Sequence, residues 1–365
     1  MRAMRSELGR ARLLGVVLAA SAAALSLLVS SGIEAAPKPK SPAADPYVAY
    51  VWPPPPDVAR IRLTGIFTRR SDVEASSRFA KVLAGASPQG PYAQLVRPIG
   101  CAFDAKGRLL VTDAQLGALF RFDKTGRRMD VFGASGTMKL KSPLGVNVGA
   151  DGTIYVADST GQRVIAYDDA GTVVRVYGRA GELVNPTDSA LSPDGAKLYV
   201  TDSKANKIVV YETATARKTA SFGEAGAGEG EFNHPSAIAT DRDGNLYVVD
   251  AINARIQILS PDGESLEQFG SLGTAPGQFI RPKDVAIDAK GRIYVTDGAF
   301  NNVQIFNDEL RLLTFVGDGG SQPGQFLVPG GIAVRGDEFA IVDQLGRRVQ
   351  SFRHLDENTA ARSDP

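Results

Sequence analysis

The sequence has very little of the chemistry that metal and redox sites usually use. It contains one cysteine, Cys101, and two histidines, His234 and His354. A single cysteine excludes an internal disulfide, and we expect Cys101 to be a small buried apolar side chain. Two histidines so far apart in the chain do not supply a histidine-based metal site. Packing of the chain itself therefore has to provide the stability.

Net charge is almost absent as well. The chain has 41 basic and 40 acidic residues, which leaves a formal charge of +1. A protein this close to neutrality has no overall field that would attract nucleic acid, so we expect no nucleic-acid partner. Phosphate-binding loops, Gly-x-Ser-x-Gly nucleophile elbows and paired cysteines are also missing.

The one long apolar run lies at the N-terminus, from Leu13 to Val29. Four arginines precede it, and Ala35 and Ala36 follow. This pattern is typical of a secretory signal, so we predict that residues 1–36 are a signal peptide and that the protein is periplasmic or extracellular. The run of about 17 residues lies at the lower limit for a membrane-spanning helix. An uncleaved anchor at residues 13–29 is the alternative, and only then do we expect contact with a membrane.

The remaining chain repeats one unit, which is clearest in residues 281–317, RPKDVAIDAKGRIYVTDGAFNNVQIFNDELRLLTFVG. Four short β-branched or aromatic runs, separated by Gly, Asn and Asp, predict four strands per unit. Six copies at steps of 43 to 49 residues predict an all-β, six-bladed β-propeller. The proline that begins each copy is Pro98, Pro143, Pro186, Pro235, Pro282 or Pro329.

An acid closes the second strand of every copy. A basic residue follows five positions later in four copies, as Arg163, Lys207, Arg255 and Arg348. We interpret the acids as structural, bonded to loop amides and paired with these bases, rather than as a ring of carboxylates that holds a cation. They are Asp113, Asp158, Asp202, Asp250, Asp297 and Asp343.

The last copy lacks a fourth strand, and residues 59–68 resemble one. We predict that Ile61 to Phe67 pairs beside Val349 to Phe352 and closes the ring, so that no sheet edge is left open. The propeller then covers residues 59–355, with a helical insertion at 69–96 that a capping box of Ser71 and Glu74 would begin. The blades start near residues 97, 142, 185, 234, 281 and 328. We expect a proline-rich tether at residues 37–58 before the ring and a disordered tail at residues 356–365 after it.

Trp52 lies in the tether and has two readings. Either its segment packs along the propeller wall and guides the closing strand, or it is a docking peptide for a partner. The phenylalanines of the GQF and GEF elements, Phe232, Phe279 and Phe326, are expected to plug the gaps between blades.

The repeat resembles the NHL family of six-bladed propellers. The residues that carry the resemblance are APGQFIRPKDVAID followed by GRIYVTD and VQIF, and it covers about residues 97–355. It is strongest in the copies that start near Ser142, His234 and Arg281. Some NHL propellers bind RNA through a basic face and one type is a zinc-dependent lyase, but mixed loop charges and only two histidines match neither.

The longer loops of such a propeller emerge on one face, and variable loops on a rigid scaffold usually carry function. We therefore expect a monomeric, non-catalytic platform without a cofactor that binds a protein, peptide or saccharide. The alternative is a metal-assisted hydrolase or lyase in the central channel, where a divalent cation and Asn147, Asn185 and Asn301 with nearby acids would imitate a lactonase site. The predicted contact residues are His234, Arg255, Arg281, Lys283, Phe300 and Arg348.

Overall fold

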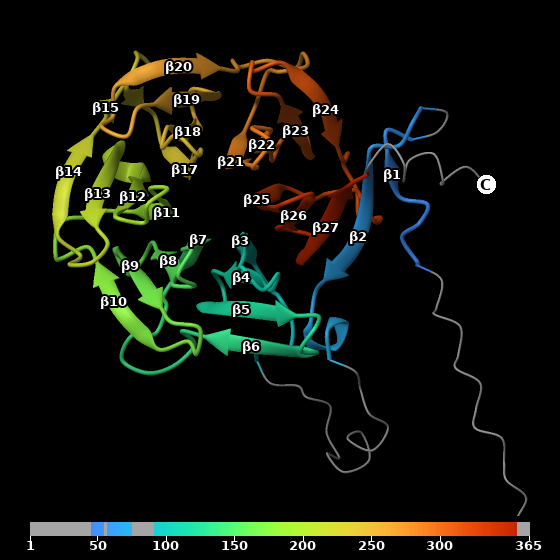
Figure 1. Ribbon diagram of the computed structural model, residues 1–365, viewed down its shortest axis with the longest axis horizontal. Coiled ribbons are helices and arrows are strands. Elements are labelled where there is room, and N and C mark those ends of the chain that lie inside the picture. The colour runs from blue at the N-terminus through green and yellow to red at the C-terminus, as the bar shows by residue number, and fades with distance from the viewer. Residues whose placement is uncertain (1–44, 55–56, 75–90, 356–365) are drawn as a thin grey trace, which may run out of the picture. The chain divides into compact units, whose positions relative to one another are not determined.

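Six β-sheets surround a central channel in the computed structural model, which describes residues 45–54, 57–74 and 91–355 (Figure 1). Five sheets have four strands and the sixth has five, and neighbouring strands within each sheet are antiparallel. The predicted six-bladed propeller is therefore confirmed.

The first strand of each blade lines the channel, and the fourth lies at the outside of the ring (Figure 1). Blade 1 comprises β3 (Pro98–Phe103), β4 (Leu109–Asp113), β5 (Ala118–Asp123) and β6 (Arg128–Phe132). Blade 2 comprises β7 (Pro143–Val148), β8 (Ile154–Asp158), β9 (Arg163–Tyr167) and β10 (Val173–Tyr177). Blade 3 comprises β11 (Pro186–Leu191), β12 (Lys197–Asp202), β13 (Lys207–Glu212) and β14 (Lys218–Phe222), with the 3-10 helix η2 (Ser203–Ala205) between β12 and β13.

The second half of the ring repeats this arrangement. Blade 4 comprises β17 (Pro235–Thr240), β18 (Leu246–Asp250), β19 (Arg255–Leu259) and β20 (Ser265–Phe269). Blade 5 comprises β21 (Pro282–Ile287), β22 (Ile293–Asp297), β23 (Asn302–Phe306) and β24 (Leu312–Val316). Blade 6 contains β25 (Pro329–Arg335), β26 (Glu338–Asp343) and β27 (Arg348–His354), and the short parallel pair β15 (Glu224–Ala225) and β16 (Glu231–Phe232) lies between blades 3 and 4.

Each first strand begins with the repeat proline, and that proline faces the repeat acid across the sheet, as in Pro282 opposite Asp297. The pairing register shifts directly after the proline in all six blades. Proline has no N–H to donate to the ladder, so a local irregularity at the start of the strand is where it is tolerated.

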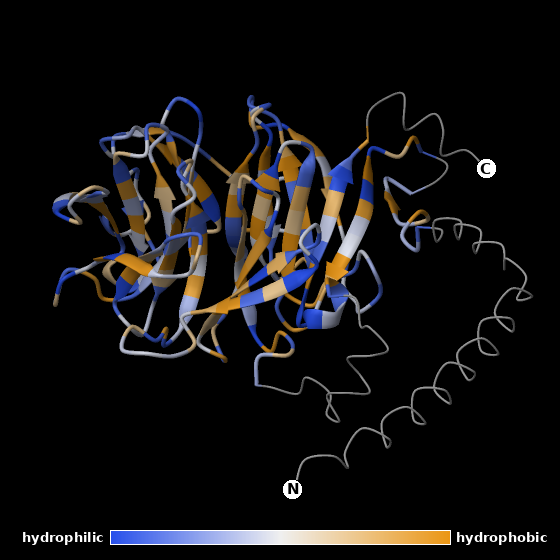
Figure 2. Ribbon diagram, turned by 60° about the horizontal axis from the view of Figure 1, so that its bottom comes forward, coloured by the Kyte–Doolittle hydropathy of each residue, from blue (hydrophilic) through white to orange (hydrophobic). Residues whose placement is uncertain are grey.

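The core consists of apolar clusters between neighbouring blades, built from side chains that alternate with polar ones along the strands (Figure 2). Phe232, Phe279 and Phe326 are fully buried in three of these joints, as predicted. Each ring packs over the glycine that ended the previous blade: a Cβ on Gly317 would lie 2.3 Å from the Phe326 ring. At other joints a leucine takes this place, Leu140 over Gly133 and Leu183 over Gly178.

The N-terminal strand β2 (Ile61–Phe67) closes the ring by pairing antiparallel with β27, from Ile61 opposite His354 to Phe67 opposite Val349 (Figure 1). The predicted closure is confirmed. A further edge strand, β1 (Val51–Trp52), pairs with β2, and the Trp52 ring packs edge-on against Phe352 with centroids 5.5 Å apart. Part of the predicted tether is thus a strand on the wall of blade 6, which is the first of the two readings of Trp52.

The predicted helical insertion is described only at its ends. Its beginning is a single 3-10 turn, η1 (Arg70–Asp72), preceded by Arg69, so Ser71 lies inside the turn and does not cap it. Asp72 takes the capping role, because its carboxylate accepts N–H groups of Thr68 and Arg69. The rest of the insertion, the signal or anchor at residues 1–36 and the tail at 356–365 lie outside the described residues. The part of the chain that the structure describes contains no helix with the length and hydrophobicity of a transmembrane span.

Candidate functional site

The propeller has two different faces. The connections between blades and the loops between second and third strands emerge on one face, which we call the long-loop face. The short hairpin turns, which join the first strand to the second and the third to the fourth, emerge on the other, the tight-turn face. Large apolar side chains are exposed on the long-loop face, on the outer strands and, as Val48 and Val58, on the N-terminal segment before β2. None of those in the described residues lies in a hairpin turn within a blade. Those on the long-loop face are Met138, Val184, Ile252, Leu272, Ile280, Leu327 and Leu345.

Four of the six predicted contact residues lie accessible on this face. Arg281 and His234 are exposed, and Lys283 and Phe300 are half-buried. Backbone contacts hold the segments of blade 5 together, because the Gly298 N–H donates to the Arg281 carbonyl at 2.9 Å. The Lys283 side chain lies over Gly298, where a Cβ would be 3.1 Å from its Cε. Burial lowers the pKa of Lys283, with a smaller contribution from the charge of Arg281.

Arg255 and Arg348 have to be removed from the predicted contact surface, because both are buried. Arg255 is 8% exposed and Arg348 is 9% exposed. The Arg348 guanidinium donates to Asp343 at 2.9 Å and to the carbonyls of Ser321, Gln322 and Gln325. Arg255 makes the corresponding contacts with Asp250 and with the loop before blade 4. These arginines hold the loops between blades in place, and their burial keeps them away from a partner on the surface.

The six repeat acids are buried, and each accepts N–H groups from the segment that leads into its own blade. Asp297, for example, accepts from Ile280, Arg281, Ala299 and Phe300. An ion pair with the base five positions later is present in blades 2, 4 and 6. Lys207 differs, since it is exposed and makes no ion pair with another described residue. No repeat acid lines the channel, so they do not form a cation-binding ring around it.

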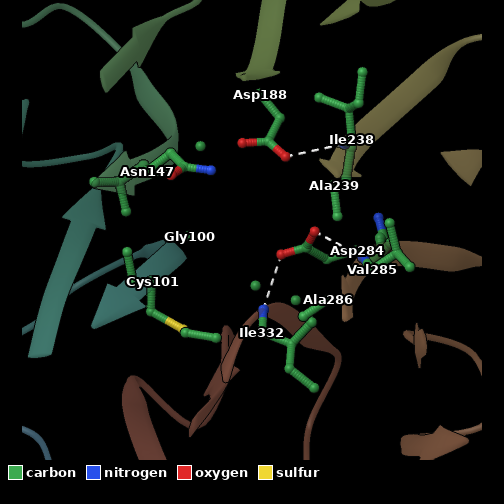
Figure 3. A pocket seen from close by; sticks show the side chains of 18 of the residues that line it. Gly100, Cys101, Asn147, Asp188, Ile238, Ala239, Asp284, Val285, Ala286 and Ile332 are labelled. Carbon is green, nitrogen blue, oxygen red and sulfur yellow. Dashed lines mark hydrogen bonds between the residues drawn. The ribbon is translucent and has the colours of Figure 1, made fainter. Parts of the chain in front are cut away.

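The central channel contains a cavity of about 430 Å³ lined by the six first strands (Figure 3). The position two residues after the repeat proline is small in four blades and acidic in two. Asp188 and Asp284 occupy it in blades 3 and 5 and point into the channel together with Asn147 of blade 2 (Figure 3). The small residues at this position are Gly100, Gly145, Ala237 and Gly331.

Each channel acid binds the backbone of the next blade. Asp188 accepts the Ile238 N–H at 3.1 Å, and Asp284 accepts the Ile332 N–H at 2.8 Å. Burial raises the pKa of Asp284 to about 7, and burial followed by the charge of Asp284 raises the pKa of Asp188. Protons are therefore held on this pair at neutral pH more readily than on exposed carboxyls.

A divalent cation would find few ligands here. The described residues contain no group of three or more His, Cys, Asp or Glu side chains placed to hold a metal ion. Asp188 and Asp284 are the only carboxylates among the described residues that line the cavity, and Asn147 and Gln344 add side-chain amide oxygens. The Asn147 amide nitrogen donates to the Ser189 carbonyl. Asn185 and Asn301 bind Ser159 and the Val328 N–H instead, so they do not complete a lactonase-like set. The fit is partial: two acids and two amides line the cavity, and the remaining ligands would be water.

The repeat alignment contained the signal for these acids. At the position two residues after the repeat proline, four copies have glycine or alanine, and Asp188 and Asp284 are the two exceptions. Because the first strands of a propeller face its channel, these two acids could be expected there. The acid that recurs in every copy gives the stronger pattern in the sequence, but it is structural.

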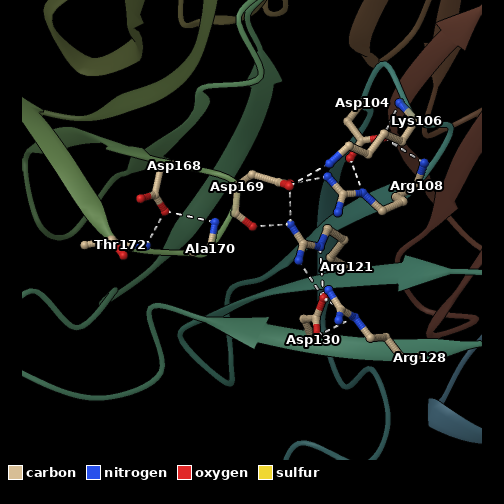
Figure 4. A network of polar contacts seen from close by, with 10 residues as sticks. All are labelled: Asp104, Lys106, Arg108, Arg121, Arg128, Asp130, Asp168, Asp169, Ala170 and Thr172. Carbon is tan, nitrogen blue, oxygen red and sulfur yellow. Dashed lines mark hydrogen bonds and ion pairs between the residues drawn. The ribbon is translucent and has the colours of Figure 1, made fainter. Parts of the chain in front are cut away.

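Charged side chains on the tight-turn face are largely satisfied by one another. Asp169 of blade 2 accepts from Lys106 at 2.7 Å, from Arg121 at 3.0 Å and from Arg108 (Figure 4). Hydrogen bonds from Lys106 and Arg108 lower the pKa of Asp169. This network joins blades 1 and 2 and has a structural role.

His354 lies at the same end of the joint between blades 5 and 6. Its Nε2 is 2.8 Å from the Tyr294 hydroxyl, and its ring packs against Phe339. Burial, followed by the charge of Arg292, lowers the pKa of His354 to about 4. The imidazole is therefore neutral at physiological pH and does not face the channel.

Comparison with known proteins agrees with this architecture. A family model described as SMP-30/Gluconolactonase/LRE-like region matches residues 92–271, which correspond to blades 1 to 4. The chain is thus similar over just under half its length to a family related to the NHL propellers, while the NHL resemblance itself stays a prediction.

Solved structures with the same fold have low sequence identity. A structural genomics protein of unknown function from Bacteroides thetaiotaomicron has a TM-score of 0.61 at 17% identity, over 80% of this chain and 76% of that one. The gluconolactonase XC5397 from Xanthomonas campestris has a TM-score of 0.55 at 16% identity, over 79% and 95% of the two chains. Virginiamycin B lyase from Staphylococcus aureus has a TM-score of 0.53 at 17% identity, over 73% and 83%. Identities this low establish the propeller fold alone.

Proposed function

We propose that this protein is a binding propeller that docks a partner on its long-loop face, outside the cytoplasm if residues 1–36 act as the predicted export signal. The observation that supports this most directly is the unequal distribution of exposed apolar side chains, which gather on the long-loop face and are missing from the described hairpin turns within the blades. Exposed apolar side chains that cluster on one side of a soluble domain are typical of an interaction site.

The scaffold beneath this face is suited to the role. Buried arginines and glutamines fasten its loops: the Gln350 amide binds both the Gly324 N–H and the Gln325 carbonyl. Loops held in this way lose little conformational entropy when a partner binds, which favours affinity.

Site-specific photo-crosslinking tests the proposal. A photoreactive residue placed at Ile252 or Leu345 samples the long-loop face, and the same residue at Asp243 or Asp308 samples the tight-turn face. We expect specific adducts from envelope extract only at the first two positions. An excess of unlabelled wild type should suppress them, and an excess of the Ile252→Glu/Leu345→Glu variant should not. Equal adducts on both faces would refute the proposal.

A second candidate is a metal-assisted hydrolase in the channel. The match to the SMP-30/Gluconolactonase/LRE-like region and the channel position of Asp188 and Asp284 favour it. Calorimetric titration with Ca²⁺, Mn²⁺ and Zn²⁺ tests it directly: stoichiometric uptake that is lost in Asp188→Asn and Asp284→Asn would support it. Absence of uptake by the folded wild type would count against a metal-dependent reaction.

A further inference from the structure

Around the channel opening on the long-loop face lies a set of segments from all six blades that we call the mouth ring. Each blade contributes two segments to it. One is the repeat proline with the two residues before it and the one after it, and the other is the four residues that follow the repeat acid. Hydrogen bonds join the two kinds of segment within blades, as from Ala114 to Arg97 and from Leu345 to Leu327. Others join neighbouring blades, as from His234 N–H to Asn206 and from Val328 N–H to Asn301.

The mouth ring contains no acidic residue. Asp and Glu make up 40 of the 365 residues, so about five would be expected in a set of this size. The same segments carry six Lys or Arg residues, and five of them are exposed, in a protein whose formal charge is only +1. The exposed bases are Arg97, Lys141, Lys204, Arg281 and Arg347.

These five bases are available for a ligand. Within the part of the chain that the structure describes, none of their side chains makes an ion pair or hydrogen bond. The repeat acids lie below the ring, but they are fully buried and their oxygens are turned to backbone N–H groups and arginines. Exposed acids of the long-loop face lie instead on the connections between blades, such as Glu224, Glu229 and Asp318.

In blades 4 to 6, exposed apolar side chains lie beside the bases of the mouth ring. Ile280 directly precedes Arg281, and Leu345 lies two residues before Arg347. Together with Ile252 and Leu327 they are exposed in blades 4 to 6. A ligand that covers this part of the ring must therefore offer negative charges at short intervals and apolar groups between them.

We propose that the mouth ring binds an acidic segment of a partner protein, in which Asp or Glu residues alternate with apolar ones. This proposal rests on the proposed function, since it names the chemistry of the partner that docks on the long-loop face. Arg281 and Arg347 bind carboxylates of the segment, and Ile280, Leu327 and Leu345 pack against its apolar side chains. Guanidinium groups suit this role because they bind carboxylates with two parallel hydrogen bonds.

Fluorescence anisotropy with designed peptides tests the proposal. The probe is a labelled peptide in which glutamates alternate with leucine and glycine; two matched peptides carry glutamine or lysine in place of glutamate. We expect the glutamate peptide to bind at least about ten-fold more tightly than the glutamine peptide. Raising the salt concentration from about 50 to about 500 mM should weaken it strongly, because exposed charges are screened.

Charge reversal locates the site. Arg281→Glu/Arg347→Glu should weaken binding of the glutamate peptide by at least about ten-fold. Arg127→Glu/Arg311→Glu makes the same change in net charge on the tight-turn face and should alter it by less than about two-fold. Arg281→Lys/Arg347→Lys should retain part of the affinity, and circular dichroism confirms that each variant is folded.

Three results would overturn the proposal: equal binding of the glutamate and glutamine peptides, no effect of reversal at Arg281 and Arg347, or tighter binding of poly(U) or phosphatidylglycerol vesicles than of the glutamate peptide. The last result would assign the mouth ring to nucleic acid or to an anionic membrane. If crosslinks form on the long-loop face but the glutamate peptide does not bind, the proposed function stands and this inference alone fails.

Discussion

At the scale of single residues, the buried repeat acids connect the loops of the long-loop face to the strands. Asp250 shows this role: it accepts the Asn233 N–H at 2.7 Å and binds the Arg255 Nε at 2.9 Å, and its side chain is fully buried. Replacing it would leave a buried guanidinium without its counter-ion and a loop N–H without an acceptor.

We therefore expect Asp250→Ala to lower the free energy of unfolding by about 3–5 kcal/mol. Denaturation in urea measures the loss. Asp243→Ala, in an exposed turn of the same blade, is the control and should change it by less than about 0.5 kcal/mol. A loss below about 1 kcal/mol for Asp250→Ala would contradict the structural role of the repeat acids.

His354 makes stability depend on pH. The groups around it are the hydroxyl of Tyr294, the acids Asp288 and Asp337, and the bases Arg292 and Lys290. Its pKa in the folded protein, about 4, lies below the usual 6.5, so the unfolded chain takes up its proton first as the pH falls. Its neutral form stabilises the fold above pH 6.5, and this stabilisation is lost as the pH falls towards 4.

The non-titrating His354→Gln variant isolates this effect. Between pH 7 and pH 4, wild type should lose about 1–3 kcal/mol more stability than the variant. Urea unfolding at several pH values gives both curves. The raised pKa of Asp284 has the opposite effect, because its contribution to stability is largest at low pH and decreases as the pH rises towards about 7. This contribution is the same in both proteins, so the difference between their curves reports on His354 alone. Parallel curves would show that His354 titrates normally.

At the scale of elements, the joint between two blades combines a glycine with a large apolar side chain. Gly317 has a φ of +93° and lies under the Phe326 ring, so an alanine there meets both backbone strain and a clash. Gly136 has a similar φ of +83° with open space around it, so an alanine there meets the strain alone.

The two alanine variants separate these effects. Gly136→Ala should cost about 1 kcal/mol, and Gly317→Ala should cost at least about 2 kcal/mol more because the Phe326 ring must move. Thermal unfolding of both variants provides the measurement. Equal losses would mean that the joint adapts and that the phenylalanine does not need the glycine.

The sequence predicted those elements that recur. One period relates the strands, the hairpin turns, the repeat prolines and acids, and the phenylalanine plugs. Closure of the ring could be predicted because the last copy lacks a fourth strand and residues 59–68 resemble one. Leu140 and Leu183 were missed as plugs because their connections are shorter and the spacing to the glycine changes. Strand β1 was missed because its proline-rich surroundings suggested an extended tether.

The site was harder to predict than the fold, because exposure depends on three-dimensional neighbours. Arg281 and Arg255 both follow the repeat pattern, yet Arg281 is exposed at the start of a strand while Arg255 lies under a loop from the previous blade. The channel acids do not recur, so Asp188 and Asp284 could be found only as exceptions in a column of small residues.

At the scale of the whole molecule, closure of the ring depends on β2. Its residues Ile61 and Leu63 are buried, and its backbone pairs with six residues of β27, Val349 to His354. Without β2, the edge of β27 would be free to pair with another chain.

A chain that begins at residue 69 should therefore form dimers or larger aggregates, whereas a chain that begins at residue 45 should remain a monomer. Size-exclusion chromatography with light scattering distinguishes these states. Addition of a synthetic peptide of residues 57–68 should restore the monomer by supplying the missing strand. A stable monomer without the peptide would show that β2 is dispensable for closure.

The pairing of β2 with β27 also sets an order of events during biosynthesis. The Thr64 hydroxyl bonds to that of Ser351, a partner 287 positions later in the chain. The ribosome makes the closing strand before any complete blade, and its counterpart belongs to the last of the six blades. A nascent chain must therefore carry β2 without its partner until blade 6 has been made, so the circle can be completed only after all six blades have emerged.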